Sequence, residues 1–146
     1  MNITLVTISG VKNKTILPLI AEYQKRLSRF AKVQILDIKE EKRFNHIAEI
    51  KKAYSSAYIF ALDEEGKTYS SDQFAKQIEH IQSHLSSHII FVIGPSAGFS
   101  VEELKTADQK LSISAMTFPH EMTTMLVCEQ VYRAFTILNN HPYHKE

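Results

Sequence analysis

Apolar side chains follow two alternating patterns along the chain. Short, nearly continuous apolar runs predict buried strands, and runs in which apolar residues recur every three or four positions predict helices with one buried face. Strands are predicted over residues 3–8, 33–38, 58–62 and 89–93, with a weaker strand over 111–116. Helices are predicted over residues 16–30, 44–54, 74–85, 101–107 and 121–138.

Polar residues mark several ends of these elements. The run Ser70-Ser71-Asp72-Gln73 is typical of a capping box, in which a hydroxyl at the cap and a glutamine three residues later satisfy the first amides of a helix. Gly94-Pro95 ends the fourth strand, and Asn139-Asn140-His141-Pro142 ends the last helix.

The alternation of strands and helices predicts one α/β domain over residues 1–146. Its strands are apolar on both faces, which indicates a mostly parallel sheet covered by helices on both sides. Such sheets bind ligands just beyond the carboxyl ends of their strands. The ends of three predicted strands, at 62–63, 94–98 and 116–120, are therefore expected to share one rim that holds a ligand.

The last predicted helix is apolar on more than one side. A helix that only docks on a sheet needs a single apolar stripe, so the wider apolar surface favours packing against a second chain as a homodimer. The residues behind this prediction are Met125, Leu126, Val127, Cys128, Val131, Tyr132, Ala134, Phe135, Ile137 and Leu138.

Composition narrows the class of protein. Of the 146 residues, 44% are apolar and 23% are charged, as in an ordinary globular domain. No apolar run approaches the ~18 residues of a membrane span, and no basic leader with a cleavage site precedes the first strand. The one cysteine, Cys128, fits a reducing compartment and is expected to be a small buried hydrophobe. A cytoplasmic protein without a membrane partner is expected.

Net charge does not by itself indicate an RNA partner. A charge of +1 and a pI near 7.9 fall short of the basic signature of proteins that hold nucleic acid by charge alone. An RNA ligand would therefore require local concentration of basic residues, for instance by the pairing of two chains.

Several strings of residues together resemble the RlmH family. In the C-terminal part they are Met116-Thr117-Phe118-Pro119-His120, residues 129–135 (Glu-Gln-Val-Tyr-Arg-Ala-Phe) and Pro142-Tyr143-His144-Lys145. Weaker matches are Phe91-Val92-Ile93-Gly94, Leu62-Asp63 with Gly66-Lys67 and Ser70-Ser71, and Ala21-Glu22-Tyr23 with Arg26-Leu27. The resemblance covers nearly the whole chain.

The resemblance implies a SPOUT-class fold with a C-terminal trefoil knot, an obligate homodimer and S-adenosyl-L-methionine as cofactor. Enzymes of this family methylate N3 of a pseudouridine in 23S ribosomal RNA, the RNA of the large ribosomal subunit, which implies the ribosome as a partner. The matching cofactor positions, at the same three strand ends, are Leu62, Gly94, Ile113, Ser114, Ala115, Met116, Thr117 and Phe118.

The resemblance also implies catalytic roles in the C-terminal tail, which in the family lies near the cofactor of the other protomer. His144 is the candidate group for removing the N3 proton, Tyr143 could stack on a base, and Lys145 could meet phosphate. His120 and Arg133 are further candidates for RNA contact, and an ion pair between Glu129 and Arg133, four residues apart, is the alternative for Arg133. From composition alone, the tail would be a frayed terminus.

Three positions depart from the family pattern. Thr124 stands where an arginine is usual, Pro95 replaces the second glycine of Ile-Gly-Gly, and Ala97 replaces a polar residue. All three are expected at the ligand-binding rim. Two alternatives to an active rRNA methyltransferase follow: a catalytically weakened relative that binds RNA or the ribosome as a dimer, and an enzyme redirected to another RNA.

Histidines offer a different kind of chemistry. His80 and His84 lie one helical turn apart, and His141 and His144 are three residues apart. Neither pair has a cysteine partner or an H-E-x-x-H pattern to complete a ligand set, so no metal site is expected.

Overall fold

Five parallel strands form one sheet in the computed structural model, which describes residues 1–41 and 44–145. The order across the sheet is β2-β1-β4-β3-β5. The strands are β1 (Asn2–Ile8), β2 (Lys32–Ile38), β3 (Tyr58–Lys67), β4 (His88–Ile93) and β5 (Gln109–Leu111). The helices are α1 (Ile16–Leu27), α2 (His46–Ala53), α3 (Ser71–His84), α4 (Val101–Thr106) and α5 (His120–Leu138).

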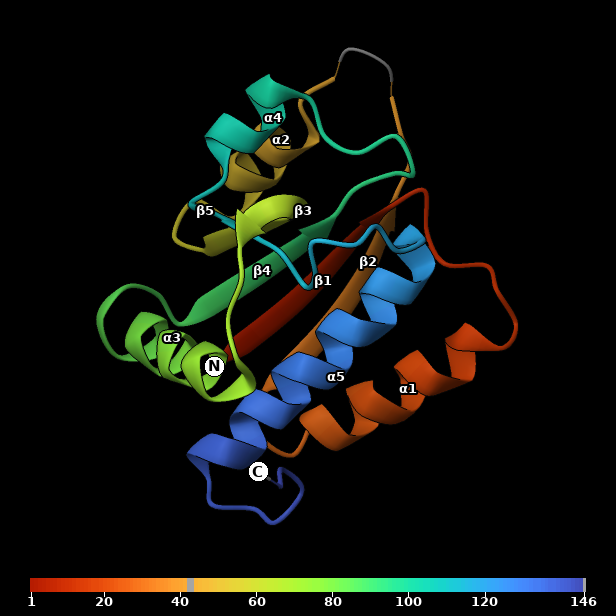
Figure 1. Ribbon diagram of the computed structural model, residues 1–146. Helices are drawn as coiled ribbons and strands as arrows, with labels where there is room; N and C mark the ends of the chain where they lie inside the picture. The colour runs from red at the N-terminus through yellow and green to blue at the C-terminus, as the bar shows by residue number, and fades with distance from the viewer. Residues whose placement is uncertain (42–43, 146) are drawn as a thin grey trace.

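Helices cover both faces of this sheet, as predicted. On one face α5 lies between α1 and α3, and on the other α2 packs beside α4 (Figure 1). Neighbouring residues of a strand point to opposite faces. Phe91 of β4 belongs to the core cluster under α5, whereas Val92 belongs to the cluster under α2 and α4. The apolar run of β4 is thus explained by burial on both sides.

The predicted capping box at the start of α3 is confirmed. The Ser70 hydroxyl accepts a hydrogen bond from the Gln73 amide at 3.1 Å, and the Gln73 side chain accepts one from the Ser70 amide at 2.9 Å. A second capping box, between Ser100 and Glu103, starts α4. The Ser-x-x-Glu spacing was readable in the sequence but was not used as a prediction.

The predicted last strand over 111–116 is mostly wrong. The strand is β5, it ends at Leu111, and the residues after it form a loop. Serine hydroxyls bind main-chain groups there: Ser112 Oγ lies 3.1 Å from the Glu64 carbonyl oxygen, and Ser114 Oγ accepts a hydrogen bond from the Met116 amide at 3.0 Å. Such side-chain bonds offer the backbone an alternative to pairing in a sheet.

β3 continues past the predicted end at Leu62 and passes very close to β5. Both Leu62 and Lys67 are paired with Leu111, so the residues between them bulge out of the strand. A Cβ atom on Gly66 would lie 2.7 Å from the carbonyl carbon of Lys110. Glycine is required here because the two backbones leave no room for a side chain. The trefoil knot stays a prediction.

Gly66→Ala is therefore expected to destabilise the fold. The added methyl group has to displace the backbone of β5, an overpacking effect of about 1–3 kcal/mol in the free energy of unfolding. Chemical denaturation monitored by circular dichroism measures it. Gly98→Ala is the matched control, because no heavy atom lies within 4 Å of a Cβ there and its cost comes only from the backbone φ of +77°. Equal stability of Gly66→Ala and the wild type would refute the close approach.

The apolar surface of α5 is covered largely by its own chain. Val131 is fully buried between the sheet and the neighbouring helices, and Cys128 and Tyr132 lie in the same cluster. The width of the apolar surface is thus explained without a second chain, and Val131 is not a surface position at which a dimer could be disrupted. Met122 is 39% exposed, and Met125 and Leu126 are partly exposed. The homodimer stays a prediction, with this exposed side of α5 as the candidate contact.

Cys128 is buried, as expected from the sequence. Burial, with a smaller contribution from the charge of Glu129, raises the pKa of its thiol to about 12. Because the thiolate is the reactive form, this cysteine is inert in the folded protein. Within residues 1–41 and 44–145, no helix has the length and apolar content needed to cross a membrane.

Candidate functional site

The three strand ends singled out in the sequence meet in one cavity of about 390 Å³. It lies at the carboxyl ends of β3, β4 and β5, where a parallel sheet is expected to bind its ligand. The lining residues come from the bulge of β3 (62–65), the segment that ends β4 and leads to α4 (93–99), the loop after β5 (Leu111, Ile113, Ser114, 116–118) and the first turn of α5 (His120 and Thr123).

The loop from Gly94 to Ser100 forms one wall of the cavity. Gly94 leaves space for the ring of Phe99, whose nearest atom would lie 3.0 Å from a Cβ at this position. A turn follows, in which the Gly98 amide donates to the Pro95 carbonyl oxygen at 2.8 Å. Gly98 takes a φ of +77°, which glycine adopts without strain.

The loop after β5 forms the opposite wall and is tied to β3. The Thr117 hydroxyl donates a hydrogen bond to the Glu64 carboxylate, and Ser112 Oγ lies close to the Glu64 carbonyl oxygen. Asp63, Glu64 and Glu65 all line the cavity, so this wall carries carboxylates. Asp63 lies in the predicted rim, whereas Glu64 and Glu65 are outside the prediction, because the apolar pattern of the strand ends at Leu62.

Nearly all of the residues predicted to bind the cofactor line this cavity. Ala115 is the exception: it belongs to the same loop but is exposed and does not line the cavity. The other seven do: Leu62, Gly94, Ile113, Ser114, Met116, Thr117 and Phe118.

The three departures from the family pattern do not all lie at the cavity. Pro95 and Ala97 line it, as expected. The expectation for Thr124 is wrong: its side chain is buried away from the cavity, where its hydroxyl donates to the His120 carbonyl oxygen at 2.9 Å. A residue near the start of a helix at the rim faces either the ligand or the core, and the sequence alone does not distinguish these two orientations.

His120 connects the cavity to the loop after β1. Its Nε2 atom lies 3.2 Å from the Gly10 carbonyl oxygen. Beside it, the Glu121 carboxylate accepts hydrogen bonds from the amides of Lys12 and Asn13 at 2.9 and 3.2 Å. The start of α5 is thereby fixed to the loop after β1. Glu121 was not singled out in the sequence, where it looked like an ordinary first-turn acid.

The C-terminal tail is packed rather than frayed. The Tyr143 ring lies 4.7 Å from the Tyr132 ring, centroid to centroid, and the Tyr143 hydroxyl donates to Glu129 Oε1 at 3.0 Å. Burial, followed by hydrogen bonding to Tyr23 and Glu129, raises the pKa of the Tyr143 hydroxyl. Tyr143 therefore remains protonated at neutral pH and cannot serve as a base.

His144 is held by two charged side chains. Its Nδ1 atom lies 3.1 Å from Arg133 Nη1, and its Nε2 atom lies 3.8 Å from Asp72 Oδ1. Arginine has no lone pair to accept with, so it donates and Nδ1 accepts. Its other ring nitrogen, Nε2, faces the Asp72 carboxylate. Lys145 is exposed.

The predicted ion pair between Glu129 and Arg133 is confirmed. Arg133 Nε and Nη2 lie 2.9 and 2.5 Å from Glu129 Oε1, and the two side chains are 24% and 12% exposed. The same carboxylate accepts from Tyr143, so Glu129 joins Arg133 to the tail. Burial acts to lower the pKa of Arg133, but the hydrogen bond and charge of Glu129 raise it overall.

The tail and the cavity of one chain lie at opposite ends of α5. His120, at the start of this helix, lines the cavity, and the tail follows the end of the helix after Leu138 (Figure 1). A helix rises about 1.5 Å per residue, so nineteen residues separate the two ends by roughly 28 Å. His144 and the cavity of the same chain do not meet.

No group of three or more histidine, cysteine or acidic side chains suited to a metal ion occurs within residues 1–41 and 44–145. The rings of His80 and His84 lie 5.1 Å apart on α3 but have no third ligand in this part of the chain.

Comparison with known proteins identifies the family. The model of the family described as predicted SPOUT methyltransferase matches residues 1–144. The chain belongs to this family. Curated relatives include the protein named ribosomal RNA large subunit methyltransferase H of an Exiguobacterium species, 38% identical over 99% of this chain and 100% of the relative. A Clostridium perfringens protein of the same name is 39% identical with the same coverage. The resemblance to the RlmH family is confirmed.

Solved structures show the same SPOUT fold at low sequence identity. A probable methylase family protein from Haemophilus influenzae has a TM-score of 0.59 and 16% identity, covering 99% of this chain and 70% of that one. The SpoU methyltransferase AviRb from Streptomyces viridochromogenes, solved in complex with AdoMet, has a TM-score of 0.51 and 12% identity, covering 89% and 56%.

Proposed function

We propose that this protein transfers a methyl group from S-adenosyl-L-methionine to N3 of a pseudouridine in the RNA of the large ribosomal subunit, acting on the ribosome in the cytoplasm. The observation that carries the proposal is the cavity at the carboxyl ends of β3, β4 and β5 in a chain of the SPOUT family. The names of the relatives support large-subunit ribosomal RNA as the acceptor.

The residues of the cavity suit S-adenosyl-L-methionine. The cofactor supplies an electrophilic methyl group on a positively charged sulfur. The carboxylates of Asp63, Glu64 and Glu65 favour a cation, and the backbone at Gly94 and the loop 113–118 offers polar groups to an adenosyl group. The volume of about 390 Å³ falls within the usual range of about 300–1,000 Å³ for small-molecule sites.

Methylation at N3 requires loss of the proton on that nitrogen, so a positioned base lowers the barrier. His144 is the proposed base. In the tail, the lone pair on its Nδ1 atom accepts a hydrogen bond from Arg133. Release from Arg133 on binding RNA would free that nitrogen. Tyr143 would contribute its aromatic face and Lys145 its charge.

Because His144 lies beside Arg133, about 20 Å along α5 from His120 at its own cavity, a complete site requires the tail of a second copy. This geometry supports a homodimer in which each cavity is completed by the partner's tail. Pairing would also gather His120, Arg133 and Lys145 from two chains along one RNA surface. The local density of basic residues would then be higher than the net charge of +1 on the single chain indicates.

The alternatives of a weakened RNA-binding dimer and of an enzyme for another RNA receive less support. The Pro95 carbonyl oxygen accepts the hydrogen bond that closes the turn, so proline is compatible with this loop. Ala97 is exposed, and its small side chain leaves the cavity open. Thr124 lies outside the cavity, so the arginine it replaces belongs to a different environment. None of the three departures closes the cavity.

Calorimetric titration with S-adenosyl-L-methionine tests the cofactor site. Micromolar affinity is expected, because the cavity is open and its walls are already held by hydrogen bonds. Titration with adenosine alone, which lacks the positive sulfur, is the control and is expected to show weaker binding. Absence of binding in protein shown to be folded would count against every enzymatic version of the proposal. Methyl transfer to purified 50S subunits and to 70S ribosomes then tests the acceptor.

A further inference from the structure

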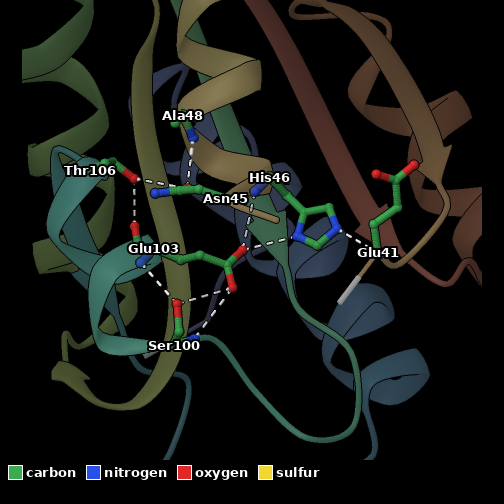
Figure 2. Close-up of polar contacts among 7 residues, drawn as sticks. All are labelled: Glu41, Asn45, His46, Ala48, Ser100, Glu103 and Thr106. Carbon is green, nitrogen blue, oxygen red and sulfur yellow. Dashed lines mark hydrogen bonds and ion pairs between the residues drawn. The ribbon is translucent and has the colours of Figure 1, made fainter. Parts of the chain in front are cut away.

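His46 and Glu103 form a buried pair on the face of the sheet opposite α5 (Figure 2). His46 is the first residue of α2, and Glu103 lies in the first turn of α4. Their side chains are 5% and 12% exposed, and His46 Nδ1 lies 3.0 Å from Glu103 Oε2. Neither residue lines the cavity, and neither belongs to a metal cluster within the described part of the chain.

The hydrogen bonds around the pair assign its protons. His46 Nε2 accepts from the Glu41 amide at 3.1 Å, so the ring proton is on Nδ1 and is donated to Glu103. Glu103 Oε2 also accepts from the His46 amide at 3.3 Å, and Oε1 lies 3.4 Å from both the amide nitrogen and the hydroxyl of Ser100. A carboxyl group surrounded by donors in this way is an ionised acceptor.

The order of the three side chains excludes a nucleophilic triad. In such a triad the histidine lies between the hydroxyl and the carboxylate, so that it can remove the proton of the hydroxyl. Here Glu103 lies between Ser100 and His46 (Figure 2). The histidine does not contact the hydroxyl, and the arrangement holds segments together instead.

The pair connects directly to the wall of the cavity. Ser100, which caps α4 and is held by Glu103, follows Phe99, whose ring packs against Gly94 and lines the cavity. A second tie lies nearby, where Asn45 Oδ1 accepts from the Ala48 amide at 2.9 Å and lies 3.4 Å from the Thr106 hydroxyl. The loop 94–100 thus ends at a point fixed to α2.

We propose that Glu103 and His46 are positioning residues for cofactor binding: they hold the far end of the loop 94–100 in the shape that admits S-adenosyl-L-methionine. This inference rests on the proposed function of the cavity. An ionised carboxylate is costly to bury unless all its hydrogen bonds are kept, so the network favours one position of α4 over others. A loop held in its binding shape loses less entropy on binding.

Glu103→Gln is the direct test. Glutamine keeps the volume of the side chain but replaces one acceptor oxygen by an NH2 group. This group is a donor and would face another donor, so at least one hydrogen bond of the network is lost. The dissociation constant for S-adenosyl-L-methionine, measured by calorimetry, is expected to rise about tenfold. The rate of methyl transfer at saturating cofactor is expected to stay near wild type. Glu102→Gln, on the exposed side of the same helix, is the matched control and is expected to change neither quantity.

A pair of substitutions at His46 separates positioning from stability. Asparagine places an amide NH2 close to the position of Nδ1 and preserves the donor to Glu103, whereas alanine removes it. His46→Asn is expected to retain most of the affinity, and His46→Ala to lose it to the same extent as Glu103→Gln. Thermal unfolding of each variant establishes that the protein titrated is folded.

The outcomes distinguish this inference from the proposed function. If the wild type fails to bind S-adenosyl-L-methionine, the function of the cavity is wrong and the inference fails with it. If the wild type binds and Glu103→Gln binds equally well, the cavity stands and the positioning role is wrong. A lower unfolding temperature with unchanged affinity of the folded protein would likewise assign the pair to stability alone.

Discussion

His144→Ala is expected to slow methyl transfer by about ten- to a hundredfold, at or somewhat below the lower end of the ~10²- to 10⁴-fold that a positioned acid or base contributes. The affinity for S-adenosyl-L-methionine should remain close to wild type, because His144 does not line the cavity of its own chain and its proposed partner is the RNA nitrogen rather than the cofactor. The loss therefore appears in the rate of the chemical step. Single-turnover assays on 50S subunits or 70S ribosomes with saturating enzyme and cofactor measure it.

His84→Ala, an exposed histidine on α3, is the matched control and should transfer methyl groups at the wild-type rate. A wild-type single-turnover rate in His144→Ala would remove this residue from the mechanism.

Hydrophobic periodicity is sufficient to predict most of the strands and helices and the rim of the sheet at which the cavity lies. The apolar run 89–93 is continuous and short, which fits a buried strand, and the segment 121–138 is long and apolar at helical spacing, which fits a helix. Both elements are present within one or two residues of the predicted ends. Because parallel strands align their carboxyl ends, the pattern places residues 62–63, 94–98 and 116–120 on one rim, and all three segments contribute to the cavity.

Periodicity failed where polar side chains or contacts from another element decide the structure. The segment 112–116 contains strand-forming residues, but Ser112 and Ser114 bind main-chain groups and β5 ends at Leu111. The wide apolar surface of α5, from which a second chain is predicted, also has a cause within this chain, because α1 and α3 both pack against the helix. The sequence does not reveal these contacts, and the homodimer stays a prediction. The His46–Glu103 pair joins residues 57 positions apart, and no local pattern marks such a contact.

The position of the tail has the largest consequence for function. It was interpreted from the resemblance as part of a composite site, and the structure adds a physical reason, since α5 holds the tail and the cavity of one chain apart. If the site is composite, a chain with a defective tail and a chain with a defective cavity should restore each other. Neither defect can be repaired within its own chain.

The cavity defect can be made with Ala97→Trp. Ala97 is exposed and lines the cavity, so an indole ring there fills the space without disturbing the core. Loss of S-adenosyl-L-methionine binding in calorimetry verifies the defect. Co-expression of Ala97→Trp and His144→Ala chains with different tags allows mixed dimers to be purified by two affinity steps, and sedimentation confirms that they are dimers.

Mixed dimers of Ala97→Trp with His144→Ala are expected to regain about half of the wild-type activity per dimer, because one of the two composite sites then has an intact cavity and an intact tail. The Ala97→Trp parent dimer should remain close to background, and the His144→Ala parent dimer should show only its rate reduced by about ten- to a hundredfold. The reciprocal control pairs a wild-type chain with a chain carrying both substitutions. That dimer has no complete composite site and should be nearly inactive, whereas a site contained within one chain would leave it half active and the first mixed dimer inactive. The two dimers carry the same substitutions in the same number, so the difference between them reports only which chain supplies the tail.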